Sequence, residues 1–383
     1  MSLAEQFEST YRSTPVIFRA PGRVNLIGEH TDYNDGFVMP AAIDLETRVA
    51  VAPREDRQVV LCSQTVGDAP LRFDLDALPE RGQGQWTDYF LGVAVMLRER
   101  GVDLRGVDVM ISSTVPLGSG LSSSAALEVG AAHALLHVAG RQTSALEIAR
   151  LCQQAENRFV GVPCGIMDQY ASALGQAGHA LLIDCRDLTA EPVPIPSGVQ
   201  VVICNSQVRH ALGNGEYAAR RRECEQGVAV LKTWHPHIRA LRDVEMWQLD
   251  EHRADLDPVV YRRCRHVIGE NDRVAAAVDA LRAGHDELFG ALLCASHDSL
   301  RDDYEVSCRE LDVLVELALE VDGVLGSRMT GGGFGGCTVS LVRDEAVAHF
   351  SAYIQREYRK ACGREAWIHA CRLSAGAGAL GRL

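Results

Sequence analysis

Short segments in which apolar and polar residues alternate dominate the first third of the chain and its last part. Such alternation is typical of strands with one buried face. The predicted strands are 16–20, 24–27, 48–53, 58–63, 107–113, 199–204, 337–342 and 366–373. We expect Pro21-Gly22 to form a turn between the first two strands, and 48–53 to pair with 58–63.

Apolar residues at helical spacing fill most of the remaining chain. In 123–138, for example, Leu127, Ala131 and Leu135 recur every four residues along one stripe. The predicted helices are 1–14, 86–100, 123–138, 144–159, 165–174, several between 216 and about 318, and 344–361. Glycine-rich loops are expected at 118–122 and 331–336.

The order of these elements predicts an α+β protein of two domains. A β-rich opening is followed by a helical middle and by an ending that mixes strands with a helix. The proline-rich segment 191–198 is the best linker candidate, which gives domains 1–195 and 196–383. A ligand site between two such domains is the natural expectation.

Composition narrows the possible functions. The chain of 383 residues is 47% hydrophobic and 23% charged, as in ordinary soluble globular proteins, and this excludes intrinsic disorder. Its net charge of −13 argues against a general nucleic-acid or anionic-membrane binder. The start of the chain lacks a signal-peptide pattern, and the longest uncharged run, Val109–Leu127, is interrupted by proline and glycine. We therefore expect a cytoplasmic protein with no membrane and no nucleic-acid partner.

Two residue types are distributed in ways that restrict the chemistry. Twelve cysteines occur without a Cys-x-x-Cys pair, so free thiols in a reducing compartment are expected. Only Lys232 and Lys360 are lysines, and neither follows the glycine that a P-loop requires. The lysine strand and His-Arg-Asp loop of protein kinases are also missing. If the chain handles phosphates, it must use backbone amides, arginine and a metal ion.

The segment Val115–Ala126, Val-Pro-Leu-Gly-Ser-Gly-Leu-Ser-Ser-Ser-Ala-Ala, lies between a predicted strand and a predicted helix. Its glycines let the backbone approach an anion, and the helix start favours negative charge. The helix dipole contributes only about 0.3–1 kcal/mol, so a metal ion should help, with the Ser124 hydroxyl as a candidate ligand. A serine-capped helix after a tight turn is the alternative.

A second glycine-rich segment, Met329–Cys337, precedes a strand, so it does not fit a dinucleotide-binding turn, which opens a helix. Five glycines in six residues cost much backbone entropy, which favours a loop that closes over a ligand.

Near the start of the chain, Glu29, His30 and Asp32 follow Gly28 at the end of a predicted strand. Dense acceptors and donors of this kind suit a polyhydroxylated ligand. A metal site and a solvated acidic loop are the alternatives.

Asp168 lies at the start of an apolar helix in Cys164–Gln169, where an unpaired carboxylate is costly. It is a candidate base if Arg23 lies beside it, because the arginine would keep it ionised and stabilise transferring charge. An ordinary helix N-terminal aspartate is the alternative. His133 and His137 lack the glutamate of a zinc-protease motif, so a packed or solvated pair is expected there.

Taken together, these motifs resemble the GHMP family of small-molecule kinases, in particular its galactose-phosphorylating branch. Val115–Ala126 is similar to the family's nucleotide motif, and Gly331–Gly336 to its C-terminal glycine motif. Gly22–Tyr33, Gly-Arg-Val-Asn-Leu-Ile-Gly-Glu-His-Thr-Asp-Tyr, resembles the signature of that branch. The likeness runs from about residue 15 to about residue 342.

The resemblance implies a two-domain GHMP kinase fold with a β-rich N-terminal domain, a ferredoxin-like C-terminal domain and the active site between them. It implies Mg²⁺- and ATP-dependent phosphorylation of the anomeric hydroxyl of α-D-galactose. Asp168 matches the catalytic base and Arg23 the arginine that stabilises the transition state. The positions that match sugar binding are Glu29, His30, Thr31, Asp32, Gly165 and Tyr217. The positions that match triphosphate binding are Gly118, Ser119, Gly120, Leu121, Ser122, Ser123 and Ser124. Ser124 and Glu156 match the magnesium ligands, and Trp86 and Tyr89 are similar to the adenine pocket.

Other functions remain open at this point. A GHMP kinase for N-acetylgalactosamine or L-arabinose would have the same motifs. A non-catalytic galactose sensor resembles these kinases but lacks the Ser-Ala pair, which is present here as Ser124-Ala125. A plain nucleotide-binding module would leave Glu29, His30 and Asp32 unexplained. We expect a monomer or a weak homo-oligomer.

Overall fold

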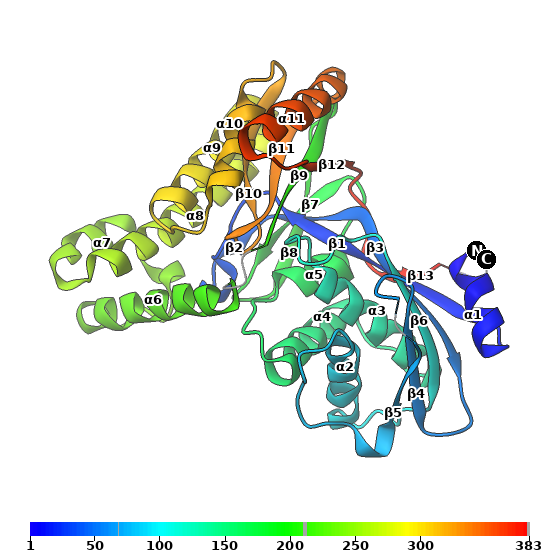
Figure 1. Ribbon diagram of the computed structural model, residues 1–383. Helices are drawn as coiled ribbons and strands as arrows, with labels where there is room; N and C mark the ends of the chain where they lie inside the picture. The colour runs from blue at the N-terminus through cyan, green and yellow to red at the C-terminus, as the bar shows by residue number, and fades with distance from the viewer. Residues whose placement is uncertain (68, 210–212, 381–383) are drawn as a thin grey trace.

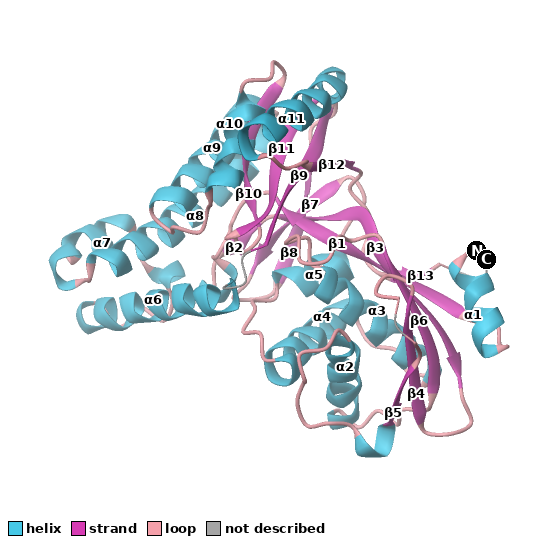
Figure 2. Ribbon diagram, viewed as in Figure 1, coloured by secondary structure: helices cyan, strands magenta, loops and turns pink. Residues whose placement is uncertain are grey.

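The computed structural model describes residues 1–67, 69–209 and 213–380, and its elements are arranged as an α+β protein built around three sheets (Figures 1 and 2). The first sheet has the strand order β13-β1-β3-β6-β4-β5. Its strands are β1 (Val16–Asn25), β3 (Pro40–Pro53), β4 (Gln58–Ser63), β5 (Leu71–Asp74), β6 (Val107–Ser113) and β13 (Gly378–Ala379).

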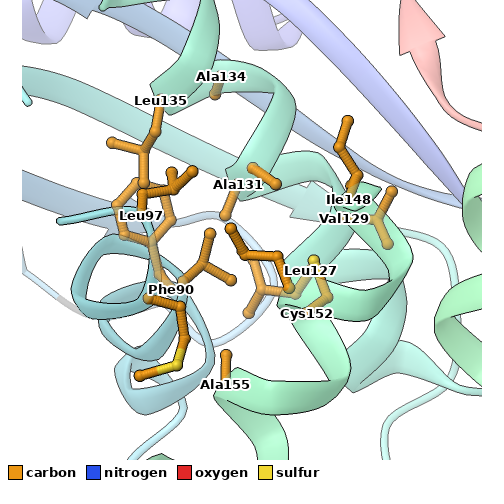
Figure 3. Packing of buried hydrophobic residues seen from close by; sticks show 14 of the residues in the cluster. Phe90, Leu97, Leu127, Val129, Ala131, Ala134, Leu135, Ile148, Cys152 and Ala155 are labelled. Carbon is orange, nitrogen blue, oxygen red and sulfur yellow. The ribbon is translucent and has the colours of Figure 1, made fainter. Parts of the chain in front are cut away.

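Helices cover the first sheet on both faces. One face carries α2 (Thr87–Glu99), α3 (Ser123–Val138), α4 (Ala145–Gln154) and α5 (Met167–Leu174). The helix α3 lies in the middle of this layer and is buried almost all round, so side chains such as Leu127 and Leu135 meet Phe90 and Leu97 of α2 (Figure 3). The short α1 (Leu3–Tyr11) packs on the opposite face through Phe7.

The second sheet is antiparallel, with the order β10-β11-β9-β12. Its strands are β9 (Val199–Arg209), β10 (Val324–Thr330), β11 (Gly335–Arg343) and β12 (Trp367–Cys371). One face packs on α10 (Arg309–Leu319) and α11 (Val347–Cys362). The other packs on α8 (Pro258–Ala283) and α9 (Asp286–Asp302), in a core that also takes in Leu26, Met39 and Ile43 from the first sheet's strands and their continuations. This shared core joins the two sheets and fixes the position of the loop between them.

Two smaller parts complete the molecule. A third sheet is made of β2 (Phe37–Val38), β7 (His179–Asp184) and β8 (Thr189–Pro194). The helices α6 (Gly213–Trp234) and α7 (Met246–Glu251) extend with α8 as an arm that has its own apolar core (Figure 1).

Three details of the sequence-based prediction were wrong. Pro21-Gly22 is not a turn, because β1 runs through it with an irregularity in register between Pro21 and Arg23. The strands β3 and β4 do not pair with each other, since β6 lies between them. The first half of the expected linker 191–198 belongs to β8, an edge strand in which prolines are tolerated because one side needs no ladder bonds.

Other expectations about the chain are met in the described residues. The α+β class and the helix at 123–138 are confirmed. His133 and His137 both pack against the ring of Phe18. All twelve cysteines lie in the described ranges and are free thiols. No helix in these ranges has the length and apolar character needed to cross a bilayer.

The end of the chain returns to the first sheet. There, β13 pairs with Phe18 and Arg19 of β1, and the Arg19 guanidinium donates to the carbonyls of Ala375 and Gly376 at 2.7 and 3.1 Å. The division at residue 195 stays a prediction, and a boundary drawn there leaves these last residues on the first sheet.

Candidate active site

Two neighbouring cavities lie where the first sheet, the second sheet and the α6 end of the helical arm meet. The larger measures about 530 Å³ and the smaller about 360 Å³. Arg23, Asp168 and Gly332 line both, so these residues mark the boundary between the two spaces.

The strand β1 carries Arg23 to this boundary. A Cβ atom at Gly22 would lie 2.7 Å from the carbonyl oxygen of Leu121, so glycine allows β1 to touch the loop that precedes α3. The Arg23 amide then donates to that same carbonyl at 3.2 Å. This contact couples the strand to the serine-rich loop.

Arg23 and Asp168 form the ion pair that the sequence suggested. Nε and Nη2 of Arg23 lie 2.8 and 2.6 Å from Oδ1 of Asp168, and Nη1 donates to the Gly120 carbonyl at 2.6 Å. The Ser122 hydroxyl donates to Oδ2 of Asp168 at 2.6 Å. The carboxylate is therefore held in one orientation while about a quarter of its side chain stays exposed, 27% against 5% for Arg23.

The loop after β1 is buried, so a solvated acidic loop is excluded. Burial raises the pKa of Asp32 to about 7, and the charge of Asp168 adds to the shift. A Cβ atom at Gly165 would lie 1.8 Å from Oδ2 of Asp32, which means that only glycine leaves room for this carboxyl group. Burial lowers the pKa of His30 well below its usual value, and its Nε2 has no partner within the described structure.

Aromatic rings hold His30 in place. Its Nδ1 lies 2.8 Å from the Tyr33 hydroxyl, which lies 2.8 Å from the Tyr304 hydroxyl. The ring of Tyr217, from α6, lies 5.6 Å from the His30 ring and lines the larger cavity. This wall offers a buried imidazole nitrogen and flat apolar surface, which is the combination that a sugar ring needs.

Glu29 links the same loop to the second sheet. Its carboxylate accepts from the Gly331 amide at 2.7 Å and the Thr330 hydroxyl at 3.2 Å, at the start of the glycine-rich loop. It also accepts from the Asn25 side chain and lies 3.1 Å from Nη2 of the fully buried Arg328. Glu29 lines the larger cavity, yet most of its hydrogen-bonding capacity holds two segments together.

The smaller cavity is built from the loop before α3. Gly118, Gly120 and Ser122 adopt positive φ angles of 65°, 81° and 59°, which turn the chain sharply at the start of the helix. The residues of this loop that line the cavity are Leu117, Gly118, Gly120, Ser122, Ser123 and Ser124, with Trp86 and Tyr89 opposite. The α3 N-terminus therefore opens into this cavity, and a helix N-terminus favours an anion such as a phosphate group.

Comparison with known proteins shows to which family the chain belongs. The family described as "Galactokinase galactose-binding signature" matches residues 5–53, "GHMP kinases N terminal domain" matches 88–176, and "GHMP kinases C terminal" matches 277–360. The galactokinase of Chloroflexus aggregans is 52% identical over 371 residues, which cover 97% of this chain and 95% of that protein. The chain belongs to the galactokinase family. A galactokinase of Roseiflexus sp. is 50% identical over 377 residues, which cover 98% of this chain and 96% of that protein.

Solved structures agree with the two-domain GHMP kinase fold, which is confirmed. The galactokinase of Lactococcus lactis, crystallised with galactose, superposes with a TM-score of 0.95 at 36% identity and covers 99% of both chains. Methanococcus jannaschii mevalonate kinase superposes with a TM-score of 0.66 at 20% identity, over 95% of this chain and 99% of that one, and shows the fold alone.

Three residues that the family resemblance assigns to ligand binding have side chains that do not line the two cavities. Thr31 is fully buried, and its hydroxyl lies 2.9 Å from the Gly28 carbonyl and 2.6 Å from the Phe37 carbonyl, so it closes the loop. Leu121 is fully buried in the core between the sheets. The Ser119 hydroxyl donates to the Pro116 carbonyl at 2.7 Å. None of these three residues lines either of the two cavities.

Behind the site lies a pair of acidic residues, of which the sequence analysis predicted only one. Glu156 was expected, but Glu128 of α3 lies with it, and Nε2 of Gln169 donates to both carboxylates at 2.6 and 3.1 Å. Burial raises the pKa of Glu156 to about 7 and that of Glu128 well above its usual value. The signal was the single acidic residue in the largely apolar helix 123–138.

A second group that the sequence analysis missed supports the loop after β1 from α8. Glu270 accepts from the amides of Gly28 and Glu29 at 2.9 and 3.3 Å, and His266 Nε2 donates to the Glu29 carbonyl at 3.1 Å. Both side chains are fully buried. Glu270 and His266 lie far from the loop in the sequence, so no local pattern connects them with it. Only the tertiary structure shows this support.

Proposed function

We propose that this chain transfers the γ-phosphoryl group of ATP to the C1 hydroxyl of α-D-galactose, giving galactose 1-phosphate and ADP. Membership of the galactokinase family makes it an ATP-dependent sugar kinase. The observation that carries the assignment of roles is the Arg23–Asp168 pair on the boundary of the two cavities. A phosphoryl group crossing that boundary would pass beside both side chains.

In this proposal the larger cavity holds the sugar. Asp32, His30, Glu29 and Tyr217 line it, and they offer two carboxyl groups, an imidazole nitrogen and a phenol to the hydroxyl groups of a hexose. The related enzyme of Lactococcus lactis was crystallised with galactose. Gly165 contributes by leaving room for Asp32, and Thr31 by holding the loop.

The smaller cavity would hold ATP. Backbone amides around Gly118–Ser124 and the α3 N-terminus face the phosphates, while Trp86 and Tyr89 border the adenine. No lysine is required, because amides and arginine supply the positive potential.

Asp168 would accept the proton of the C1 hydroxyl as the sugar oxygen attacks. A well-placed base of this kind is worth roughly 10²–10⁴-fold in rate. Two bonds from Arg23 and one from Ser122 fix the carboxylate, so little reorganisation is needed at the moment of transfer. The guanidinium of Arg23 also faces the charge that develops on the phosphoryl oxygens.

The residues around Ser124 fit a divalent metal ion, which the kinase family typically uses, and we propose Mg²⁺. The Ser124 hydroxyl bonds to the Glu156 carboxylate, and Oε1 of Glu128 is buried without a partner in the described structure. An excess of buried carboxylate oxygen of this kind suits a hard cation. Ser124 and Glu156 would hold it, and when bound it would neutralise charge on the transferring phosphoryl group.

The decisive experiment measures ADP release with Mg-ATP and a panel of acceptors: galactose, N-acetylgalactosamine, L-arabinose, glucose, mevalonate and homoserine. Turnover well above the others on galactose is the expected result. Faster turnover on N-acetylgalactosamine or L-arabinose would keep the mechanism and overturn the substrate. Galactose binding without any turnover would overturn the enzyme and favour a sensor.

Three further expectations stand as proposals. We propose that the chain divides into domains 1–195 and 196–383, near the short segment between β8 and β9. A monomeric or weakly self-associating state and a cytoplasmic location are proposed from the sequence alone.

A further inference from the structure

The far end of the helical arm carries a group of side chains that the kinase mechanism does not use. His235 directly follows α6, Glu251 is the last residue of α7, and His252 caps α7. One ligand atom from each of these three residues lies within 4.8 Å of the others. The group stands at the opposite end of α6 from Tyr217 (Figure 1).

Both imidazole rings offer a free nitrogen. Nε2 of His235 is buried and has no hydrogen-bond partner in the described structure. Nδ1 of His252 lies 3.2 Å from Oδ2 of Asp255, an arrangement that keeps the proton on Nδ1 and leaves the lone pair of Nε2 available. A carboxylate behind a histidine is the usual second partner of a metal-binding imidazole.

The surroundings favour a cation at this position. The C-terminal end of α6, a helix of 22 residues, directs negative charge toward His235. Glu251 makes no ion pair among the described residues, and its exposed carboxylate is available as the third ligand. The ring of Trp234 stacks on His252 at 4.9 Å with an interplanar angle of 15°, which fixes the plane of the imidazole.

We propose that His235, Glu251 and His252 bind one transition-metal ion of the zinc class. Two imidazole nitrogens and one carboxylate form a zinc ligand set whose fourth position is left to water. The ion would tie the end of α6 to the end of α7 and stabilise the arm by binding only the folded state. The active-site cluster differs, because its oxygen ligands suit Mg²⁺.

A second mixed cluster, Asp44, His369 and Cys371, is a weaker candidate. Nε2 of His369 already lies 2.9 Å from Oδ1 of Asp44, and Arg372 pairs with the other carboxylate oxygen at 3.2 Å. A cation there would have to displace both partners.

The test titrates the metal-free full-length protein with Zn²⁺ by calorimetry, in excess Mg²⁺ so that the oxygen site is filled. Wild type should bind one tight equivalent that the His235→Ala/His252→Ala double variant loses. His237→Ala is the matched control, because His237 is exposed, its ring lies 6.0 Å from that of His235, and it is not a proposed ligand. Asp255→Asn should weaken the same equivalent by about 10–100-fold.

A spectroscopic measurement separates this site from the cysteines. Co²⁺ bound here should quench the fluorescence of Trp234 and show no thiolate charge-transfer band. Glu251→Gln, a change at an exposed residue, provides a second variant if the double variant misfolds, and it should weaken Zn²⁺ binding at least tenfold. The proposal is wrong if wild type binds no tight equivalent, or if the ligand variants bind as wild type does. Galactose phosphorylation by these variants should stay at the wild-type rate, which keeps this test independent of the kinase proposal.

Discussion

A single guanidinium group organises the boundary between the two cavities, which is the proposed reacting centre. Arg23 contacts Asp168 through Nε and Nη2, and it contacts the Gly120 carbonyl through Nη1. One planar side chain therefore sets both the direction of the Asp168 carboxylate and the position of the serine-rich loop. Because the planar guanidinium makes both contacts, the arginine side chain itself is important here, and not its charge alone.

Replacing Asp168 with Asn should lower kcat for galactose by roughly 10²–10⁴-fold, because an amide cannot take the proton of the C1 hydroxyl. ATP binding should stay close to normal, and steady-state kinetics with a nucleotide-binding assay would measure both. Asp187→Asn, at an exposed position in the turn between β7 and β8, is the matched control and should behave as wild type. Near-normal kcat in the Asp168 variant would contradict the role given to this carboxylate.

Replacing Arg23 with Lys should also lower kcat/KM, although the replacement conserves the charge. An ammonium group cannot bond to Asp168 and to the Gly120 carbonyl with the same geometry, so at least one charge-assisted bond is lost. Such a bond contributes about 1.5–3 kcal/mol, which predicts a fall in kcat/KM of roughly 10–150-fold. The same kinetic assay tests this, and wild-type kcat/KM in the lysine variant would refute it.

At the scale of elements, the loop between β10 and β11 closes the larger cavity, and its glycines are required by contact as well as by conformation. Gly333 has a φ of 81°, and a Cβ atom there would lie 2.2 Å from the Val306 carbonyl oxygen. That same oxygen accepts from the Phe334 amide at 2.7 Å. An added methyl group would therefore push the loop away from its anchor.

A left-handed conformation costs an ordinary residue about 1–2 kcal/mol, and Gly333→Ala should lower the free energy of unfolding by more than this. The same variant should raise KM for galactose. Gly198→Ala is the matched control, because Gly198 has a φ of 78° but open space around its Cβ position. Urea unfolding and galactose kinetics measure the two effects. Equal losses of stability in both variants would show that conformation alone explains the cost.

At the scale of the whole molecule, the fold gathers carboxyl groups from distant segments into one buried region. Asp32 follows β1, Glu128 lies in α3, Glu156 follows α4 and Asp168 begins α5. Burial raises the pKa of Asp32 and of Glu156 to about 7, and the charge of Asp168 adds to both shifts. The ligand-free fold therefore disfavours the charged forms of these two carboxyl groups.

This arrangement predicts a pH dependence of stability. The folded protein keeps the proton of Asp32 up to about pH 7, whereas the unfolded chain loses it near 3.8. Between these values the folded state binds more protons, so its free energy of unfolding falls as the pH rises. Asp32→Asn removes this contribution, and the variant should gain stability relative to wild type between about pH 5 and pH 7.

Urea unfolding of the ligand-free proteins at both pH values would measure this difference. Buried Glu270 has a lowered pKa, so its stabilising contribution is lost only at more acidic pH and does not overlap with the chosen window. For Asp187→Asn, the free energy of unfolding should change with pH as it does in wild type. Parallel curves for Asp32→Asn and wild type would contradict the raised pKa of this group.

The local sequence determined a large part of this picture. Periodicity located α3 and β6 at their observed bounds, because each lies in a segment where one pattern runs uninterrupted. Short motifs located Arg23, Asp168 and the loop before α3, because the residues of each motif act together within one turn of chain. The family could be recognised for the same reason.

Contacts between distant segments decided the rest. Pro21-Gly22 resembles a turn, yet pairing with β3 carries the strand through it, and the prolines of 191–194 resemble a linker, yet an edge strand accepts them. The Glu29–Arg328 pair, the support from Glu270 and the return of β13 to β1 join positions far apart in the chain. No local pattern encodes such pairings, because burial and charge at each residue depend on what the fold places beside it. The sequence by itself therefore determined which chemically active residues are present, and the tertiary structure decided which side chains line the cavities and which hold the site together.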